Sequence, residues 1–135
     1  MKIKRIEHVG INVGSLETSK RLWEECFGIS IGEVSRPKKI PIEIAMYPIG
    51  ESMVELVAGT TPESIIPESN RGINHICFEV ENIDEAIAEL KEKGIRLAKL
   101  FTDGPRIGHG GCRVVFLDTA DTDNCLIELA ELPRS

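Results

Sequence analysis

The chain of 135 residues is long enough for one domain with a buried core, and its 22 acidic and 16 basic residues give a formal net charge of −6. That charge disfavours nonspecific binding to nucleic acid or to an anionic membrane. The four cysteines are too irregularly spaced for a thiolate zinc site or a dense disulfide framework. No apolar run reaches membrane-spanning length, so we expect a cytoplasmic protein without nucleic acid or membrane partners.

The first predicted strand covers residues 3–13 and contains a histidine among alternating apolar residues. The alternation places His8 on one face together with the small residue Gly10. A helix should follow this strand, because Ser15 can cap its start and Gly28 can end it.

Three short strands are expected after the helix, separated by turn-forming residues, at residues 30–35, 42–47 and 52–57. In the last of them Met53, Glu55 and Val57 share a face. Glu55 is therefore a candidate to face the same way as the histidine of the first strand.

The order of a histidine-containing strand followed by a capped helix then repeats. Residues 59–70 hold two prolines and many turn formers and should connect the two parts. A strand at residues 72–80 contains His75, and a helix follows that Asn82 can cap and Gly94 can end.

A constant offset indicates an internal duplication. His75 follows His8 by 67 positions (75 − 8), and the apolar residues around the two histidines keep this offset. Further strands are expected at residues 96–100, 113–117 and 125–130. On the last strand Glu128 shares a face with Ala130.

Each copy thus offers one histidine on its first strand and one glutamate on its last. If the two copies pack around one cavity, two imidazoles and two carboxylates converge, a suitable set for a divalent first-row metal with a position left for substrate. The predicted metal ligands are His8, Glu55, His75 and Glu128.

A glycine-rich loop at residues 104–111 is a candidate anion site. Its backbone N–H groups could accept a substrate phosphate or carboxylate, and nearby arginines add positive charge. The predicted substrate-binding residues are Arg106, Gly110, Gly111 and Arg113. His109 has no counterpart in the repeat and is not assigned to the metal.

The repeated order of His-strand, helix and Glu-bearing hairpin resembles the vicinal oxygen chelate (glyoxalase/bleomycin resistance) superfamily. Within it, several segments are similar to the methylmalonyl-CoA epimerase family: residues 50–57, 74–80, 108–117 and 126–129. The resemblance covers nearly the whole chain. Glyoxalase I is similar at the same four ligand positions.

For the fold, the resemblance implies an α+β protein in which two βαβββ modules form an incomplete barrel around a metal site. The whole chain, residues 1–135, would be one such domain. Its first module would span about residues 1–58, the linker about 59–71 and the second module about 72–135.

For the function, the resemblance implies an epimerase of a 2-acyl-CoA, such as methylmalonyl-CoA, that abstracts a proton and forms a metal-stabilised enolate. The metal would be cobalt, nickel, zinc or manganese. Glu128 would also exchange protons, and Glu43 would be the second carboxylate on the opposite side of the substrate.

Two other functions stay open. One is a glyoxalase I-type lyase or isomerase of a thiol hemithioacetal, and the other is a protein that binds a metabolite or drug. The family's His-Pro-Lys stretch is replaced here by the acidic residues 118–123, which would repel CoA phosphates if they met the ligand. Whether two chains pair as a homodimer is also left open.

Overall fold

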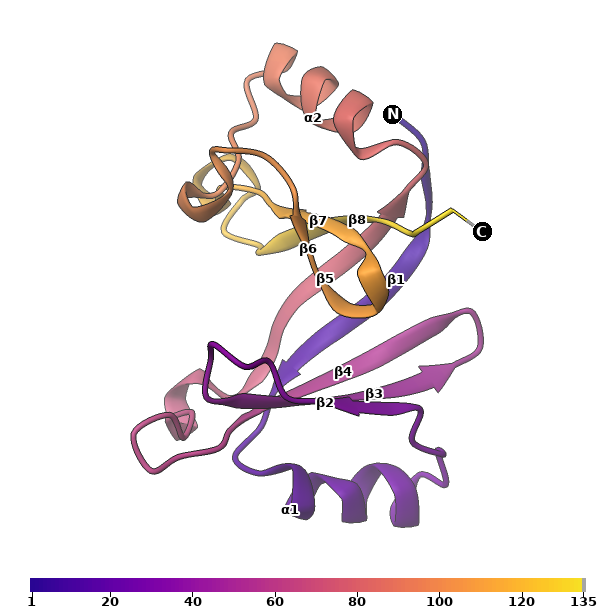
Figure 1. Ribbon diagram of the computed structural model, residues 1–135, viewed down its shortest axis with the longest axis vertical. Coiled ribbons are helices and arrows are strands. Elements are labelled where there is room, and N and C mark those ends of the chain that lie inside the picture. The colour runs from indigo at the N-terminus through magenta and orange to yellow at the C-terminus, as the bar shows by residue number, and fades with distance from the viewer. Residues whose placement is uncertain (135) are drawn as a thin grey trace. The chain divides into compact units, whose positions relative to one another are not determined.

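The computed structural model describes residues 1–134, which divide into two compact units. We call residues 8–74 the N-terminal unit, and residues 1–7 together with 75–134 the C-terminal unit. The division falls inside strands β1 (Ile3–Asn12) and β5 (Gly72–Val80), so each unit contains part of both strands (Figure 1).

Strands of the N-terminal unit follow the order β2-β3-β4-β1. The hairpin of β3 (Ile42–Ile49) and β4 (Ser52–Gly59) is antiparallel, whereas β1 runs parallel to β4. Strand β2, which the sequence predicts at residues 30–35, is shorter than expected and covers Glu33–Ser35. A 3-10 turn, η2 (Glu68–Asn70), lies in the connection to the second module.

The helix of the N-terminal unit begins where the sequence predicts. The Ser15 hydroxyl oxygen accepts a hydrogen bond from the Thr18 N–H at 3.0 Å, which satisfies one of the open N–H groups of the first turn. The helix starts as α1 (Leu16–Lys20) and continues as a π-helical segment, η1 (Arg21–Cys26). Gly28 follows with φ +68°, a conformation that glycine adopts without strain.

This helix covers one face of the unit's sheet (Figure 1). The apolar side chains between helix and sheet form one core cluster, centred on Leu16, Ala45, Tyr47, Leu56 and Ala58. Leu56 and Ala58 alternate with Glu55 and Val57 along β4, so the opposite face of the sheet carries Glu55.

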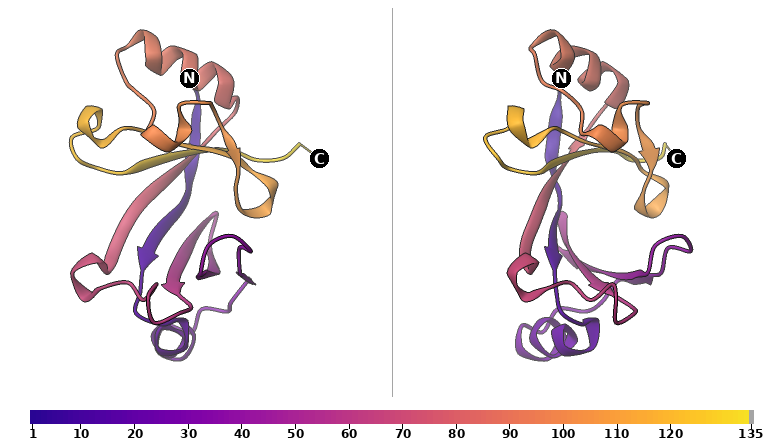
Figure 2. Two further views of the ribbon diagram at one scale, coloured as in Figure 1. Left: turned by 60° about the vertical axis from the view of Figure 1, so that its left-hand side comes forward. Right: turned by 90° about the vertical axis from the view of Figure 1, so that its left-hand side faces the viewer.

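Strands of the C-terminal unit follow the order β5-β8-β7-β6, and Figure 2 shows them from two further sides. Strand β8 (Ile127–Glu131) runs parallel to β5 and antiparallel to β7 (Arg113–Phe116). The edge strand β6 covers Arg106–Ile107. Three 3-10 turns complete the unit: η3 (Lys99–Phe101), η4 (His109–Gly111) and η5 (Thr119–Asp121).

Helix α2 (Ile83–Glu92) has the predicted cap, since the Asn82 side chain accepts a hydrogen bond from the Glu85 N–H at 3.0 Å. Its buried side chains pack with Leu97, Val115 and Leu129 in a second core cluster on one face of the sheet. A smaller cluster on the other face contains the buried residues Cys77, Cys112, Val114 and Ala130. Two of the cysteines therefore serve as small apolar core residues.

The strand predicted at residues 96–100 is wrong. This segment makes only an isolated antiparallel bridge, Leu97 with Leu117, and then turns into η3. The Leu97 side chain is buried in the core, and the Ala98 N–H donates to the Phe116 carbonyl at 2.8 Å. Besides β8, the strand that pairs with β7 is β6, which lies within the predicted glycine-rich loop.

Each module thus has the order βαβββ, and the predicted α+β fold of two such modules is confirmed. In both modules the first strand runs parallel to the last, so the histidine strand and the glutamate strand are direct neighbours. Among the described residues no helix is both long and apolar enough to cross a membrane.

Candidate metal centre

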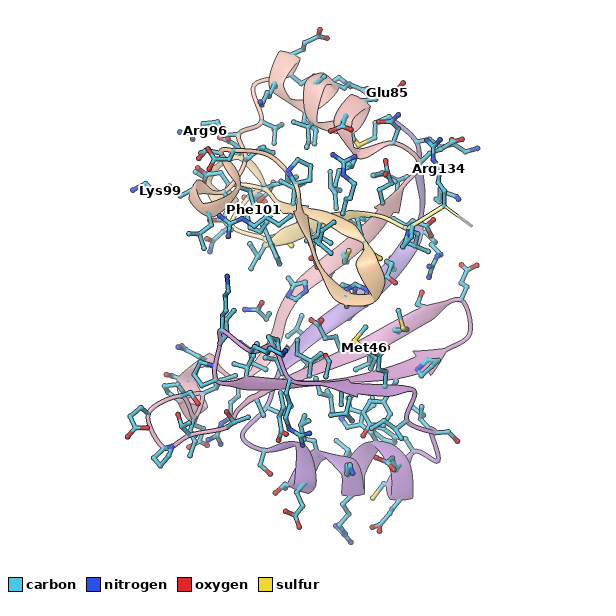
Figure 3. The ribbon with its side chains drawn as sticks, in the orientation of Figure 1. Met46, Glu85, Arg96, Lys99, Phe101 and Arg134 are labelled. Carbon is cyan, nitrogen blue, oxygen red and sulfur yellow. The ribbon has the colours of Figure 1, made fainter. Side chains whose placement is uncertain are left out.

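The N-terminal unit brings a histidine and a glutamate together on the face away from its helix. His8 is fully buried and Glu55 is 7% exposed, and the His8 Nε2 atom lies 3.7 Å from the Glu55 Oε1 atom. In the sheet, Glu55 stands between Gly10 of β1 and Met46 of β3. Gly10 has no side chain to cover the carboxylate, and Figure 3 shows Met46 on the side of the sheet opposite α1.

The C-terminal unit brings together the corresponding pair. His75 is 7% exposed and Glu128 is 6% exposed, with 3.2 Å between the His75 Nε2 atom and the Glu128 Oε1 atom. Glu128 is flanked by Cys77 on β5 and by Phe116 on β7. The Phe116 ring meets the His75 ring edge to face, with 5.2 Å between the centroids, and so restricts the orientation of the imidazole.

The donor atoms of these two pairs are suitable for binding a divalent metal. Each pair offers one imidazole nitrogen and one carboxylate oxygen, the donors preferred by zinc and its first-row neighbours. A buried carboxylate is costly unless a positive charge or hydrogen bonds compensate for it, and a metal would provide that charge. The predicted ligands of each module therefore lie together within their own unit.

Glu43 does not share the face of Glu55. It pairs with Ala58 across the β3–β4 hairpin and alternates in step with Ala45 and Tyr47, which belong to the core under the helix. The Glu43 Oε2 atom accepts a hydrogen bond from Arg36 Nε at 3.1 Å and lies 3.0 Å from Arg36 Nη2 in an ion pair. The carboxylate expected to act as a second base is thus held by an arginine on the opposite side of the sheet.

Arg113 likewise lies on the helix side of its sheet. Its guanidinium donates two hydrogen bonds to the Asp84 carboxylate, at 2.8 and 3.1 Å, and lies 3.7 Å from Glu131. The hydrogen bond to Arg113 lowers the pKa of Asp84, and the same bond raises the pKa of the arginine. Arg113 therefore ties α2 to β7 and is not brought to the His75 face.

Arg106 stands differently, because its partner in the β6–β7 ladder is Val114, which shares the face of Ala130 and Glu128. Its guanidinium lies 5.3 Å from the centroid of the Phe101 ring, and Phe101 contacts Phe116 at 5.5 Å. Contacts thus link Arg106 through the Phe101 and Phe116 rings to the imidazole of His75, and Figure 3 labels Phe101.

Gly110 and Gly111 form a tight turn with φ +60° and +79°. The Gly111 N–H donates to the Gly108 carbonyl at 3.3 Å, and the Cys112 N–H donates to the His109 carbonyl at 3.0 Å. The Gly111 N–H is thus used within the turn, and the substrate-binding role of Arg106, Gly110 and Gly111 stays a prediction.

Sequence reasoning missed a buried ionic cluster in the C-terminal unit. Glu7 is 2% exposed, and its Oε1 atom lies 3.0 Å from the His109 Nε2 atom, while its Oε2 atom lies 3.9 Å from Arg5. Arg5 in turn donates to Glu79 at 2.6 Å. In the sequence, His109 stands out because it has no counterpart in the repeat. Its partner Glu7, however, is 102 residues away in the sequence.

The acidic segment at residues 118–123 is partly neutralised within its own unit. Arg96 donates to both carboxylate oxygens of Asp121, at 2.9 and 3.0 Å, and its backbone N–H donates to the same group at 2.8 Å. These hydrogen bonds lower the pKa of Asp121 to about 2. The Asp118 side chain accepts a hydrogen bond from the Ala120 N–H, so its carboxylate stabilises the local turn.

A family model identifies the class of protein to which this fold, with its repeated His/Glu pairs, belongs. The model described as Glyoxalase/Bleomycin resistance protein/Dioxygenase superfamily matches residues 7–116. The chain therefore belongs to this superfamily, which confirms the resemblance noted in the sequence.

Individual relatives show which members of the superfamily this chain is similar to. The chain is 32% identical to an ethylmalonyl-CoA/methylmalonyl-CoA epimerase from Cereibacter sphaeroides, over 96% of this chain and 99% of that protein. It is 30% identical to the mitochondrial methylmalonyl-CoA epimerase of Bos taurus, over 94% of this chain and 74% of that protein. A solved structure of a Streptomyces coelicolor methylmalonyl-CoA epimerase variant, in complex with 2-nitronate-propionyl-CoA, superposes with a TM-score of 0.86 at 25% identity, covering 98% of this chain and 100% of that one.

Proposed function

We propose that this chain is a metal-dependent epimerase of a 2-acyl-CoA and that methylmalonyl-CoA is its substrate. The main support is a buried His/Glu pair at the same place in each module. The proposal is also supported by 32% identity to an ethylmalonyl-CoA/methylmalonyl-CoA epimerase along nearly all of both chains.

In this proposal one divalent metal is held by the pairs of both modules, His8 with Glu55 and His75 with Glu128. When bound, the ion would supply positive charge that attracts the substrate's carboxylate and stabilises the negative charge developing on its thioester oxygen. The donor set of two imidazoles and two carboxylates leaves coordination positions for these oxygens.

Glu128 is the group we assign to proton transfer. A Glu128 oxygen takes the proton from the carbon between the carboxylate and the thioester, and the bonding electrons move to the thioester oxygen. The side chain is well placed to hold one geometry, because β5 and β7 flank it on both sides. A proton delivered by solvent water to the other face of the planar intermediate re-forms the C–H bond with inverted configuration, and Glu128 returns its own proton to solvent.

Solvent exchange tests this function. In deuterated water the metal-loaded protein should replace the α-hydrogen of methylmalonyl-CoA with deuterium, because a proton taken by a carboxylate equilibrates with solvent. Loss of the exchange in Glu128→Gln, with the metal still bound, would support the role of this carboxylate. Undiminished exchange in that variant would contradict it.

The hemithioacetal of methylglyoxal, given to the same metal-loaded sample, tests the glyoxalase-type alternative. Turnover of that compound without exchange of methylmalonyl-CoA would replace the epimerase proposal. Binding of either compound without turnover would favour the third alternative, a metabolite-binding protein.

A further inference from the structure

A basic hollow lies in the N-terminal unit, at the loop that joins β2 to β3. Figure 1 shows the backbone of this loop. It has a volume of about 490 Å³ and is lined by residues 36–42 and Thr60. These lining residues include three cations, Arg36, Lys38 and Lys39, and no carboxylate.

The loop has a defined shape. Prolines stand at positions 37 and 41, and each restricts the backbone. The Thr60 N–H donates to the Pro41 carbonyl at 2.9 Å, which ties the end of the loop to the residue that follows β4. At the other end Arg36 is held by Glu43, at 3.0 and 3.1 Å. A site fixed in this way loses little conformational entropy when it binds a ligand.

The charge of this loop contrasts with the rest of the chain. The protein as a whole carries −6, yet residues 36–39 contribute three positive charges within four positions. Glu43 offsets one of them, and Lys38 and Lys39 are both exposed to solvent. A local concentration of positive charge on an acidic protein attracts small anions, whereas the overall charge still disfavours a polyanion such as nucleic acid.

The loop also lies at a suitable distance from the candidate metal ligands of its unit. It leads directly into β3, where Met46 stands beside Glu55. At about 3.3 Å per residue, the four steps from Ile42 to Met46 span about 13 Å along the strand. In a CoA thioester the phosphates are likewise far from the reacting acyl group, because the extended pantetheine arm separates them.

We propose that the loop at residues 36–39 binds the phosphate groups of the nucleotide end of CoA. Lys38 and Lys39 provide the charge, and Glu43 positions Arg36 at the edge of the hollow. This inference rests on the proposed function, and it assigns to Glu43 a positioning role in carrier recognition instead of proton transfer.

Two thioesters of the same acyl group test the proposal. Methylmalonyl-CoA carries the phosphates, whereas methylmalonyl-pantetheine lacks them and has the same reacting centre. In the double variant Lys38→Gln/Lys39→Gln, KM for the CoA ester should rise about tenfold, since two charge contacts of ordinary strength are lost. The kcat for both substrates and KM for the pantetheine ester should stay unchanged.

Two controls make the result specific. The double variant Lys2→Gln/Lys91→Gln removes the same charge from exposed positions of the C-terminal unit and should leave KM for the CoA ester unchanged. In the parent protein, added salt should raise KM for the CoA ester more than for the pantetheine ester, because ions screen exposed charges. Equal KM values of parent and loop variant for the CoA ester, or an equal rise for both thioesters, would overturn the proposal.

A binding measurement separates this inference from the proposed function. Adenosine 3′,5′-bisphosphate, which contains phosphates but no acyl group, should bind the parent and bind the loop variant about tenfold more weakly. If neither thioester is turned over, this difference would still support the loop site while the epimerase proposal fails. Equal binding by the two proteins, or no binding by the parent, would contradict the loop site.

Discussion

In the N-terminal unit the paired histidine and glutamate stand 3.7 Å apart, with Gly10 and Met46 beside the carboxylate. In the C-terminal unit the same two residue types stand 3.2 Å apart, and an aromatic ring restrains the imidazole. The loops differ more, since one unit has a basic loop at residues 36–39 and the other an acidic segment at 118–123. The two modules therefore share the same pair of residue types on corresponding strands, while their connecting loops differ in charge.

The largest effect should come from comparing the two carboxylates. Glu128→Gln removes a proton acceptor as well as a ligand charge, so the exchange rate should fall by about 10²- to 10⁴-fold. Glu55→Gln retains an oxygen donor at a position to which we assign only a ligand role, so its loss should be much smaller. The rate of deuterium exchange is measured for both variants at equal metal content. Equal losses of rate would contradict the assignment of proton transfer to Glu128 and not to Glu55.

The ionic cluster around Glu7 gives the next largest effect. Removing the imidazole takes one hydrogen-bond partner from the buried Glu7 carboxylate, which keeps Arg5 at 3.9 Å, so His109→Ala should reduce the free energy of unfolding by about 1–3 kcal/mol. In the N-terminal unit, Glu25→Ala breaks the exposed Arg21–Glu25 pair and should cost at most about 1 kcal/mol. Urea denaturation of the two variants provides the comparison, and equal losses would contradict the buried role of Glu7.

Much of the site could be predicted because strands alternate with a period of two. This period alone places His8 with Gly10, and Glu55 with Met53, on shared faces. It could not place Glu43, because the face of one strand relative to another depends on the hairpin register, and only the observed pairing with Ala58 fixes it.

Long-range contacts were the other limit of the sequence. The pair of Glu7 and His109 joins distant segments, and no local pattern in either segment indicates the other. The residues near Leu97 have the composition of a strand, but burial of that leucine and the turn at Lys99–Phe101 prevail over local preference.

The stability of the two units should also depend differently on pH. Burial, together with the hydrogen bond from the Tyr47 hydroxyl to Glu24 at 2.7 Å, raises the pKa of Tyr47 to about 12. Because the folded pKa lies above the ordinary value of 10.0, this stabilisation is complete below about pH 10 and is lost as the pH rises toward 12.

In the C-terminal unit the sign is reversed, because Arg96 lowers the pKa of Asp121 to about 2. Its contribution is present above about pH 4 and is lost as the pH falls toward 2. Midpoints of thermal unfolding measured against pH should therefore show a weaker alkaline decline in Tyr47→Phe and a weaker acid decline in Asp121→Asn. A weaker acid decline in Tyr47→Phe together with a weaker alkaline decline in Asp121→Asn would contradict the roles given to these contacts.

The smallest effect is expected for Glu43→Gln. A residue on the helix side of the sheet should leave kcat and deuterium exchange unchanged. KM for the CoA ester should change by at most about fivefold, since an exposed ion pair contributes at most about 1 kcal/mol. A large loss of exchange with both thioesters would restore Glu43 as the second base and remove its assigned role in the basic loop.

The central claim, one metal held by both modules, is tested most directly by metal content. After reconstitution and removal of loosely bound ions, the parent should retain about one divalent metal per chain. His8→Ala and His75→Ala, one in each module, should each lose it, while circular dichroism shows that both variants remain folded. If the parent retained two metals and each variant one, or if both variants bound metal like the parent, the account of a shared centre would be contradicted.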